Sequence, residues 1–233
     1  MKNQIKDLFL QNLEIDLSET QIKQFITYYE FLVKKNQEIN LTAITKWEDV
    51  LNKHFLDCAL LIKYYDLNDK NILDIGAGAG FPSIVLKILV PSLKVTIVES
   101  LLKRCNFLDE LIVLLDLSFV KIVNERAEVF ATKQTEVYDC VLSRAVSTLP
   151  VILELSTRYL KIKGDIIAYK SQKHEEELSL SKGAIQHLFL RHIDTFLENE
   201  QDFGVRAFMI FKKMKQTPNI YPRSYNKIKK QPL

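Results

Sequence analysis

The sequence predicts an α/β fold: a doubly wound sheet with helices on both faces, preceded by a helical extension. The first observation is that short apolar runs alternate with helical segments from residue 71 to residue 182, as in parallel strands joined by crossover helices. The second is that strand-like runs at 185–196 and 205–213 are joined by a polar loop without a helix. These two runs are expected to pair antiparallel, which gives a seven-stranded, mostly parallel sheet whose last strand is antiparallel.

The helical extension covers residues 1–65. Apolar residues recur at helical spacing over residues 2–13. A capping box then runs from Ser18 to Gln21, and apolar residues continue at every third or fourth position. A long amphipathic helix is therefore expected to end near Gln37.

A third helix is expected after the irregular segment 38–44. Residues 45–48 match a second capping box, which would start this helix. On it His54 and Asp57 lie three residues apart and hence on one face. For both residues, packing or pairing within the protein remains an alternative to a role in chemistry.

The sheet lies within residues 66–213. Pro150 stands where a first-turn proline is tolerated, and residues 163–165 have the composition of a turn. The expected strands are 71–75, 94–98, 119–123, 138–143 and 165–170, and the expected helices are 81–90, 101–115, 149–160 and 173–182.

The composition is that of a packed globular protein, with 233 residues, 47% hydrophobic content and a net charge of +3. No apolar run approaches bilayer length and the N-terminus lacks the apolar core of a signal peptide, so a soluble, cytoplasmic protein without membrane contact is expected. Cys58, Cys105 and Cys140 lack metal-ligand spacing, so we expect neither a disulfide nor a metal. The chain is expected to be a monomer.

Residues 214–233 form a basic tail. From Lys212 to the C-terminus there are seven basic residues and no acidic one. Such a segment is typical of a polyanion contact, and it is equally typical of a solvated, disordered tail. Charge alone leaves the two alternatives open.

The clearest chemical signal is the turn after the first expected strand. Asp74 is followed by Gly76, Gly78 and Gly80, a G-x-G-x-G spacing that differs from the G-x-G-x-x-G of dinucleotide sites. Glycines allow a ligand to approach bare backbone, and no lysine of the phosphate-loop type follows. The same pattern also occurs where a strand and a helix merely pack closely.

Glu99 favours the ligand interpretation. It closes the second apolar run, 19 residues after Gly80, where a carboxylate can hold the two hydroxyls of a ribose. The turn and Glu99 together indicate a nucleoside ligand without a pyrophosphate. S-adenosylmethionine is the usual ligand of that kind.

The segment after the fourth strand bears on the acceptor. It contains Arg144 and lacks the Asn/Asp-Pro-Pro-Tyr type of motif that orients exocyclic amines. Guanine N7 suits this composition because it already presents a lone pair, so catalysis can rest on alignment. Arg144 would grip a phosphate or the methionine carboxylate, and the alternative for it is a structural ion pair.

Several segments resemble the RsmG (GidB) family of bacterial 16S rRNA (guanine-N7) methyltransferases. They follow the family order from residue 40 to the last residue. The glycine motif is common to many methyltransferases, whereas N-L-T-A-I, S-R-A-V and Y-P-R are specific to this family. The matching segments are 40–44, 54–57, 74–82, 98–100, 126–128, 143–146, 221–223 and 230–233.

The resemblance implies a Rossmann-like class I methyltransferase that uses S-adenosylmethionine to methylate N7 of guanine 527 of 16S rRNA in the 30S subunit, without a general base. The expected cofactor-binding residues are Gly76, Gly78, Gly80, Phe81, Glu99, Ala127, Glu128 and Arg144. The expected catalytic residues are Asn40, His54, Asp57, Arg126 and Arg144. The expected RNA contacts are Lys170, Arg206, Arg223, Lys227, Lys229 and Lys230.

Two other functions compete with this interpretation. A binding module without chemistry would show a damaged cofactor motif, and no damage is visible beyond Ser83. Ser83 and Ser171 stand where the family usually has glycine. A small-molecule methyltransferase is disfavoured by the basic tail and by the lack of a long lid insertion. Deleting residues 214–233 is expected to weaken RNA binding and its salt dependence and to leave cofactor binding intact.

Overall fold

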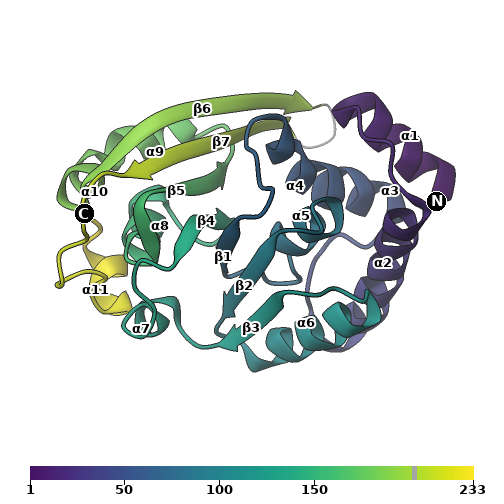
Figure 1. Cartoon of the computed structure of the whole chain (residues 1–233), viewed down its shortest axis with the longest axis horizontal. Helices are drawn as coiled ribbons and strands as arrows, with labels where there is room; N and C mark the ends of the chain where they lie inside the picture. Colours follow the sequence, from purple (N-terminus) through teal and green to yellow (C-terminus); the bar gives the residue numbers. More distant parts are fainter. Residues whose placement is uncertain (201–203) are drawn as a thin grey trace.

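The computed structural model describes residues 1–200 and 204–233 (Figure 1). Within these residues the strands of the single sheet are β1 (Asn71–Ile75), β2 (Lys94–Glu99), β3 (Val120–Asn124), β4 (Tyr138–Arg144), β5 (Leu160–Lys170), β6 (Leu190–Glu200) and β7 (Gly204–Lys213). Their order is β3-β2-β1-β4-β5-β7-β6. The first five pair in parallel, and β7 is antiparallel to both β5 and β6. The predicted mostly parallel sheet with one reversed strand is confirmed.

Helices surround the sheet and form the N-terminal extension. The α-helices of the described ranges are α1 (Lys2–Leu13), α2 (Glu19–Ile39), α3 (Trp47–Val50), α4 (Asp57–Ala59), α5 (Ser83–Leu89), α6 (Leu102–Leu114), α7 (Ala127–Phe130), α8 (Leu149–Thr157), α9 (His174–Leu180), α10 (Lys182–His187) and α11 (Tyr225–Lys230). Between α3 and α4 the chain has π-helical geometry (Leu51–Leu56), and a 3-10 helix (Leu60–Lys63) follows α4.

Alternate residues of each strand enter two cores on opposite faces of the sheet. In β1, Ile72 packs in the core that contains α1, α2, α5 and α6. Leu73 and Ile75 pack in the other core, together with Ala184 of α10 and Ile228 of α11. The N-terminal extension and the C-terminal segment are therefore both packed against the sheet, at opposite ends of the molecule in Figure 1.

The two predicted capping boxes have different outcomes. The first is confirmed, because Ser18 and Gln21 exchange both of its hydrogen bonds at the start of α2. The second is wrong: α3 begins one residue later, so Lys46 takes the N-cap position without a side-chain cap. Thr45 lies outside the helix, where its carbonyl accepts a hydrogen bond from the Tyr29 hydroxyl at 3.1 Å.

The segment before β6 is helical where a strand was expected. Residues 182–187 form α10, so the strand predicted for 185–196 begins only at Leu190. Ala184 and Leu188 are both fully buried, four residues apart, and this is the spacing of one helix face. The helix predicted for 173–182 accordingly ends at Leu180 as α9.

β5 begins earlier than predicted. The expected turn at 163–165 is a bulge within the strand, since Tyr138 pairs with Leu160 while Cys140 already pairs with Asp165. Lys163 in this bulge has a φ of 70°. Because β5 begins at Leu160, α8 ends at Thr157, before the predicted limit at residue 160. The strands β1 to β4 and the helices α5 and α6 agree with their predicted bounds to within two residues at each end.

The cysteines are buried free thiols, at positions 58, 105 and 140. Burial raises the pKa of the Cys58 thiol to about 12, so this thiol stays protonated at neutral pH. Among the residues that the structure describes, no helix combines the length and the apolar character needed to cross a bilayer.

Candidate active site

The glycine turn after β1 serves both packing and ligand approach. A Cβ at Gly80 would lie 2.8 Å from Ile84 and from the Tyr28 hydroxyl, so this glycine is required by close packing. Gly78 differs, because it has a φ of 60° and a Cβ there would meet nothing within 4 Å. The backbone at Gly78 is thus open to a ligand.

Glu99 lies beside this turn at the end of β2. Its carboxylate accepts hydrogen bonds from the backbone N–H groups of Gly78, at 3.3 Å, and Leu101, at 3.0 Å. The guanidinium of Arg104 lies 3.7 Å away. Glu99 as a whole is 3% exposed, so its carboxylate is a fixed acceptor at the point where a ribose would meet the turn.

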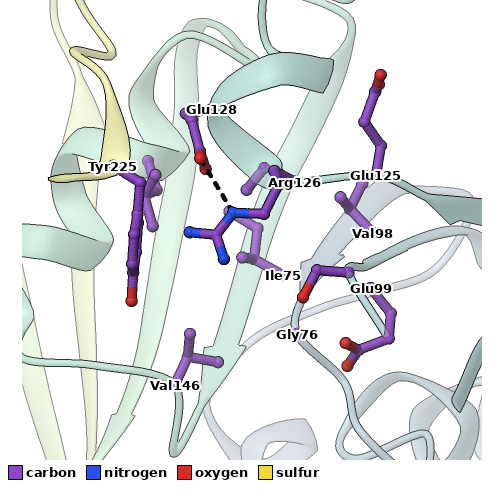
Figure 2. A pocket seen from close by; sticks show the side chains of 12 residues that line it. Ile75, Gly76, Val98, Glu99, Glu125, Arg126, Glu128, Val146 and Tyr225 are labelled. Atoms are coloured by element: carbon purple, nitrogen blue, oxygen red, sulfur yellow. Dashed lines mark hydrogen bonds and ion pairs between the residues drawn. The ribbon is translucent and has the colours of Figure 1, made fainter. Parts of the chain in front are cut away.

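A cavity of about 130 Å³ lies at the carboxyl ends of β1, β2 and β3. Figure 2 shows its walls, which come from the glycine turn, the end of β2, α7 and α11. Four of the predicted cofactor residues line it: Gly76, Glu99, Ala127 and Glu128.

Three other residues predicted for the cofactor lie elsewhere. Gly80 and Phe81 are buried behind the turn, where the Phe81 ring stacks on Tyr28 with the ring centres 5.5 Å apart. Arg144 lines a neighbouring cavity. Phe81 and Gly80 therefore shape the turn from inside the protein, and direct contact of either with a ligand stays a prediction.

The cavity also contains a contact that the sequence did not indicate. The guanidinium carbon of Arg126 lies 4.0 Å from the centre of the Tyr225 ring, and its Nε donates to Glu128 at 3.0 Å. Tyr225 belongs to the segment predicted to be a basic tail. The available signal was the spacing of Tyr225 and Ile228 after Ser224, which matches a short helix with an apolar face.

The C-terminal segment is anchored to the sheet domain. Arg223 donates from Nε and Nη2 to the carboxylate of Glu154, at 2.8 and 2.6 Å, and this carboxylate is fully buried. Tyr225 lines the first cavity, so deletion of residues 214–233 would remove part of its wall. That cofactor binding survives this deletion stays a prediction. Arg223 is not among the residues that line the two cavities, and its predicted RNA contact stays a prediction.

Other basic residues of this region are also paired within the protein. Lys212 forms an ion pair with Asp165 at 2.7 Å, and the buried ammonium of Lys213 lies 3.1 Å from Glu136. The cations that stay exposed in the described segment 212–233 are Lys215, Lys227, Lys229 and Lys230.

A second cavity of about 510 Å³ adjoins the first, with Val146 in the wall of both. Its lining includes His54, Arg144, Lys170 and Arg206. Segments far apart in the sequence therefore bring three basic side chains and a histidine to one hollow beside the glycine turn.

Asp57 holds two of these basic residues in place. Its fully buried carboxylate accepts from Arg144 Nε at 2.8 Å and from Arg206 at 2.5 and 2.9 Å. The structural ion pair left open for Arg144 is thus present. One carboxylate faces two guanidinium groups, so the group of three carries a net positive charge toward the cavity.

Lys170 is held by two other residues that line the second cavity. Its ammonium donates to the carbonyl of Ser147 and to the carboxylate of Glu177, both at 2.7 Å. Ser171, one of the two departures from the family pattern, lines the same cavity. The other departure, Ser83, is fully buried, and its N–H donates to Asp74 at 3.2 Å.

His54 stacks on Phe81 with the ring centres 4.4 Å apart. Its Nδ1 lies 3.1 Å from the carbonyl of Lys53, so this nitrogen carries the proton, and Nε2 accepts from the Thr42 hydroxyl at 2.9 Å. Burial, and secondly the charge of Arg144, lower the pKa of His54 to about 4. The imidazole is therefore neutral at physiological pH.

We expect this neutral imidazole to make the protein less stable in acid. The pKa of His54 is lower in the folded state than the unfolded value of 6.5, so the unfolded chain takes up the proton first as the pH falls. Between pH 7.5 and pH 5 the free energy of unfolding is expected to drop by about 2 kcal/mol because of this group. Urea unfolding of the wild type and of His54→Gln at both pH values measures the difference, and an NMR titration of His54 near pH 6.5 would contradict it.

Asn40 lies apart from both cavities. It is exposed at the end of α2, in a left-handed conformation with a φ of 46°. It is not among the residues that line the two cavities described above. Its predicted catalytic role stays a prediction, whereas Thr42, two residues later, contacts His54 directly.

The sheet order, the glycine turn after β1 and the carboxylate of Glu99 at the end of β2 define a class I methyltransferase. Solved structures with this fold include that of M. jannaschii TYW2 in complex with AdoMet, which has a TM-score of 0.57 and 18% identity and covers 74% of this chain and 80% of that chain. Precorrin-6y C5,15-methyltransferase from Geobacter metallireducens has a TM-score of 0.51 and 17% identity, covering 73% of this chain and 90% of that one. At these identities the likeness shows the fold.

The family model described as rRNA small subunit methyltransferase G matches residues 21–203. Relatives named ribosomal RNA small subunit methyltransferase G are 46% identical in Staphylococcus aureus, 44% in Oceanobacillus iheyensis and 41% in Mesoplasma florum. Each match covers 96% of this chain and 95%, 96% and 94% of the respective relative. The chain belongs to the rRNA small subunit methyltransferase G family, and it is a methyltransferase.

Proposed function

We propose that this protein transfers the methyl group of S-adenosylmethionine to N7 of one guanine in 16S rRNA, at position 527 of the small ribosomal subunit. The observation that carries the proposal is the pair of adjoining cavities. One has the glycine turn and a fixed carboxylate, the other has a positively charged lining, and Val146 lies in both walls.

The first cavity suits the nucleoside of the methyl donor. Glu99 would accept hydrogen bonds from the ribose hydroxyls, and the open backbone at Gly78 allows close approach. Ala127 and the neighbouring apolar residues of the cavity would contact the adenine base. When bound, S-adenosylmethionine supplies an electrophilic methyl group on a sulfonium sulfur.

The second cavity suits a nucleotide acceptor. Arg144, Arg206 and Lys170 carry the positive charge that favours a phosphate, and the ion pairs with Asp57 and Glu177 fix their positions. With its imidazole neutral and hydrogen-bonded at both nitrogens, His54 is suited to pack against the acceptor.

These side chains favour an acceptor atom that loses no proton. The carboxylate of Asp57 is occupied by two arginines, and the low pKa of His54 makes it a weak base. Guanine N7 meets this condition because its lone pair forms the new N–C bond directly while the C–S electron pair stays on sulfur. The protein then contributes alignment and exclusion of water.

The exposed lysines of α11 extend the positive surface beside the first cavity. Lys227, Lys229 and Lys230 project from the helix whose first residue, Tyr225, lines that cavity. We assign RNA phosphate contacts to these three lysines, so RNA affinity should fall steeply with salt concentration.

The test uses reconstituted small subunits and naked 16S rRNA with 7-deazaguanosine at position 527, in which a C–H group replaces N7. We expect methyl incorporation from a labelled donor into normal RNA and none into the substituted RNA. A control RNA with 7-deazaguanosine at a neighbouring guanine should be methylated normally. Equal methylation of the RNA substituted at position 527 would show that another atom is the acceptor.

A further inference from the structure

The cavity beside the glycine turn is too small, in this conformation, for the nucleoside that the proposed function requires. Its volume is about 130 Å³, whereas ligand pockets commonly measure about 300–1,000 Å³. Figure 2 shows the guanidinium of Arg126 reaching into the cavity between Tyr225 and Glu99. Entry of a nucleoside therefore requires movement of this side chain.

The contacts that hold the Arg126 side chain are weak enough for a ligand to replace them. Its side chain is 46% exposed, and it pairs with Glu128 at the rim and stacks on the Tyr225 ring. Ion pairs at exposed side chains contribute little to stability because water screens them. Rotation of the Arg126 side chain would release the guanidinium and leave the backbone of α7 in place.

Tyr225, in contrast, is fixed. Its helix is held by fully buried Ile228, three residues later. Immediately before the helix, Arg223 binds the buried carboxylate of Glu154 through two nitrogen atoms. The Tyr225 ring would therefore remain in the cavity wall and present a flat face when the guanidinium leaves.

That face suits a purine. Nucleobases stack on aromatic side chains, and the ring lies in the same cavity as Glu99 and Ala127. A base stacked on Tyr225 would occupy the position that the guanidinium now holds. The displaced cation would lie on the same side of the molecule as the exposed lysines of α11, where the proposed function places RNA.

We propose that the adenine of the methyl donor replaces the Arg126 guanidinium against Tyr225, and that the released guanidinium binds an RNA phosphate. The inference rests on the proposed function and adds a cofactor-binding residue from the C-terminal segment. It also links the two substrates, because RNA that holds Arg126 away from Tyr225 favours donor binding, and the linkage is reciprocal.

The first experiment measures binding of S-adenosylhomocysteine, the demethylated product, by calorimetry with the full chain. Tyr225→Leu, which keeps an apolar side chain for packing, is expected to bind about tenfold more weakly. Tyr225→Phe keeps the ring and should bind within about twofold of the wild type. Arg126→Met removes the competing cation and should bind as tightly as the wild type or several-fold more tightly.

The second experiment needs no substitution in α11. The salt dependence of RNA binding by the wild type is measured with and without saturating S-adenosylhomocysteine. One additional phosphate contact from Arg126 should steepen the slope of log K against log salt by about 0.7. In Arg126→Met the two slopes should be equal. Replacement of Lys94, at the start of β2, or of Lys121, on the edge strand β3, by methionine serves as a charge control.

The outcomes separate this inference from the proposed function. If the wild type fails to bind S-adenosylhomocysteine, the proposed function itself fails. If the wild type binds it but Tyr225→Leu binds equally well, or Arg126→Met binds more weakly, the exchange at Tyr225 is wrong while the methyltransferase site stands. An unchanged salt slope in the wild type also overturns the exchange.

Discussion

Asp57→Asn is expected to destabilise the protein by about 3–5 kcal/mol and to abolish methyl transfer. The carboxylate is fully buried and accepts from both Arg144 and Arg206. An amide of the same size leaves two guanidinium groups without a countercharge, which is costly where water is excluded. Urea unfolding and methylation of small subunits measure the two effects.

A matched control makes this prediction specific. Asp16→Asn changes the same side chain in an exposed pair with Lys6, and its effect on stability should be small. If Asp57→Asn unfolds at the same urea concentration as the wild type, the two arginines do not depend on Asp57 for their positions.

Glu99→Ala is expected to weaken binding of S-adenosylhomocysteine on the order of 100-fold, because two hydrogen bonds to an ionised acceptor are lost. The affinity of Glu99→Gln for S-adenosylhomocysteine should lie between those of Glu99→Ala and the wild type, since an amide oxygen still accepts a hydrogen bond. Calorimetry gives the affinities, and thermal unfolding shows whether the fold is retained.

The control for Glu99 is an exposed acidic residue away from the cavities. Glu38→Ala, on the surface of α2, removes one negative charge without touching the glycine turn. Its affinity should equal that of the wild type. If Glu99→Ala binds S-adenosylhomocysteine as tightly as the wild type, Glu99 does not bind the ribose.

Local sequence patterns were sufficient for the sheet and for half of the site. The glycine turn and Glu99 are close to strands of strong apolar character, and strand order in a doubly wound sheet brings them together. Their prediction needed only the spacing of residues within about 30 positions, and the structure places both at one cavity.

The arrangement around Asp57 was beyond such reasoning. Arg206 lies 149 residues from Asp57 in the sequence, and nothing local distinguishes it from an exposed arginine. The pairing depends on β7 returning beside β5, so that a residue near the start of β7 faces the helical extension. Sequence left His54 and Asp57 with open alternatives for the same reason.

The basic tail shows how charge counting can mislead. Seven cations suggested a separate RNA-binding segment, but Lys212, Lys213 and Arg223 pair with carboxylates of the sheet domain. The acidic partners come from distant strands and helices and are invisible to composition. Only the three lysines of α11, with Lys215, keep exposed charges in the described part of the segment.

The measurement that tests the central claim most directly is mass analysis of the 16S rRNA fragment that contains guanine 527, from cells with and without the gene. The account predicts one 7-methylguanosine in this fragment, lost when the gene is deleted and restored by the wild type but not by Glu99→Ala. The same 7-methylguanosine content in the presence and absence of the gene would contradict it.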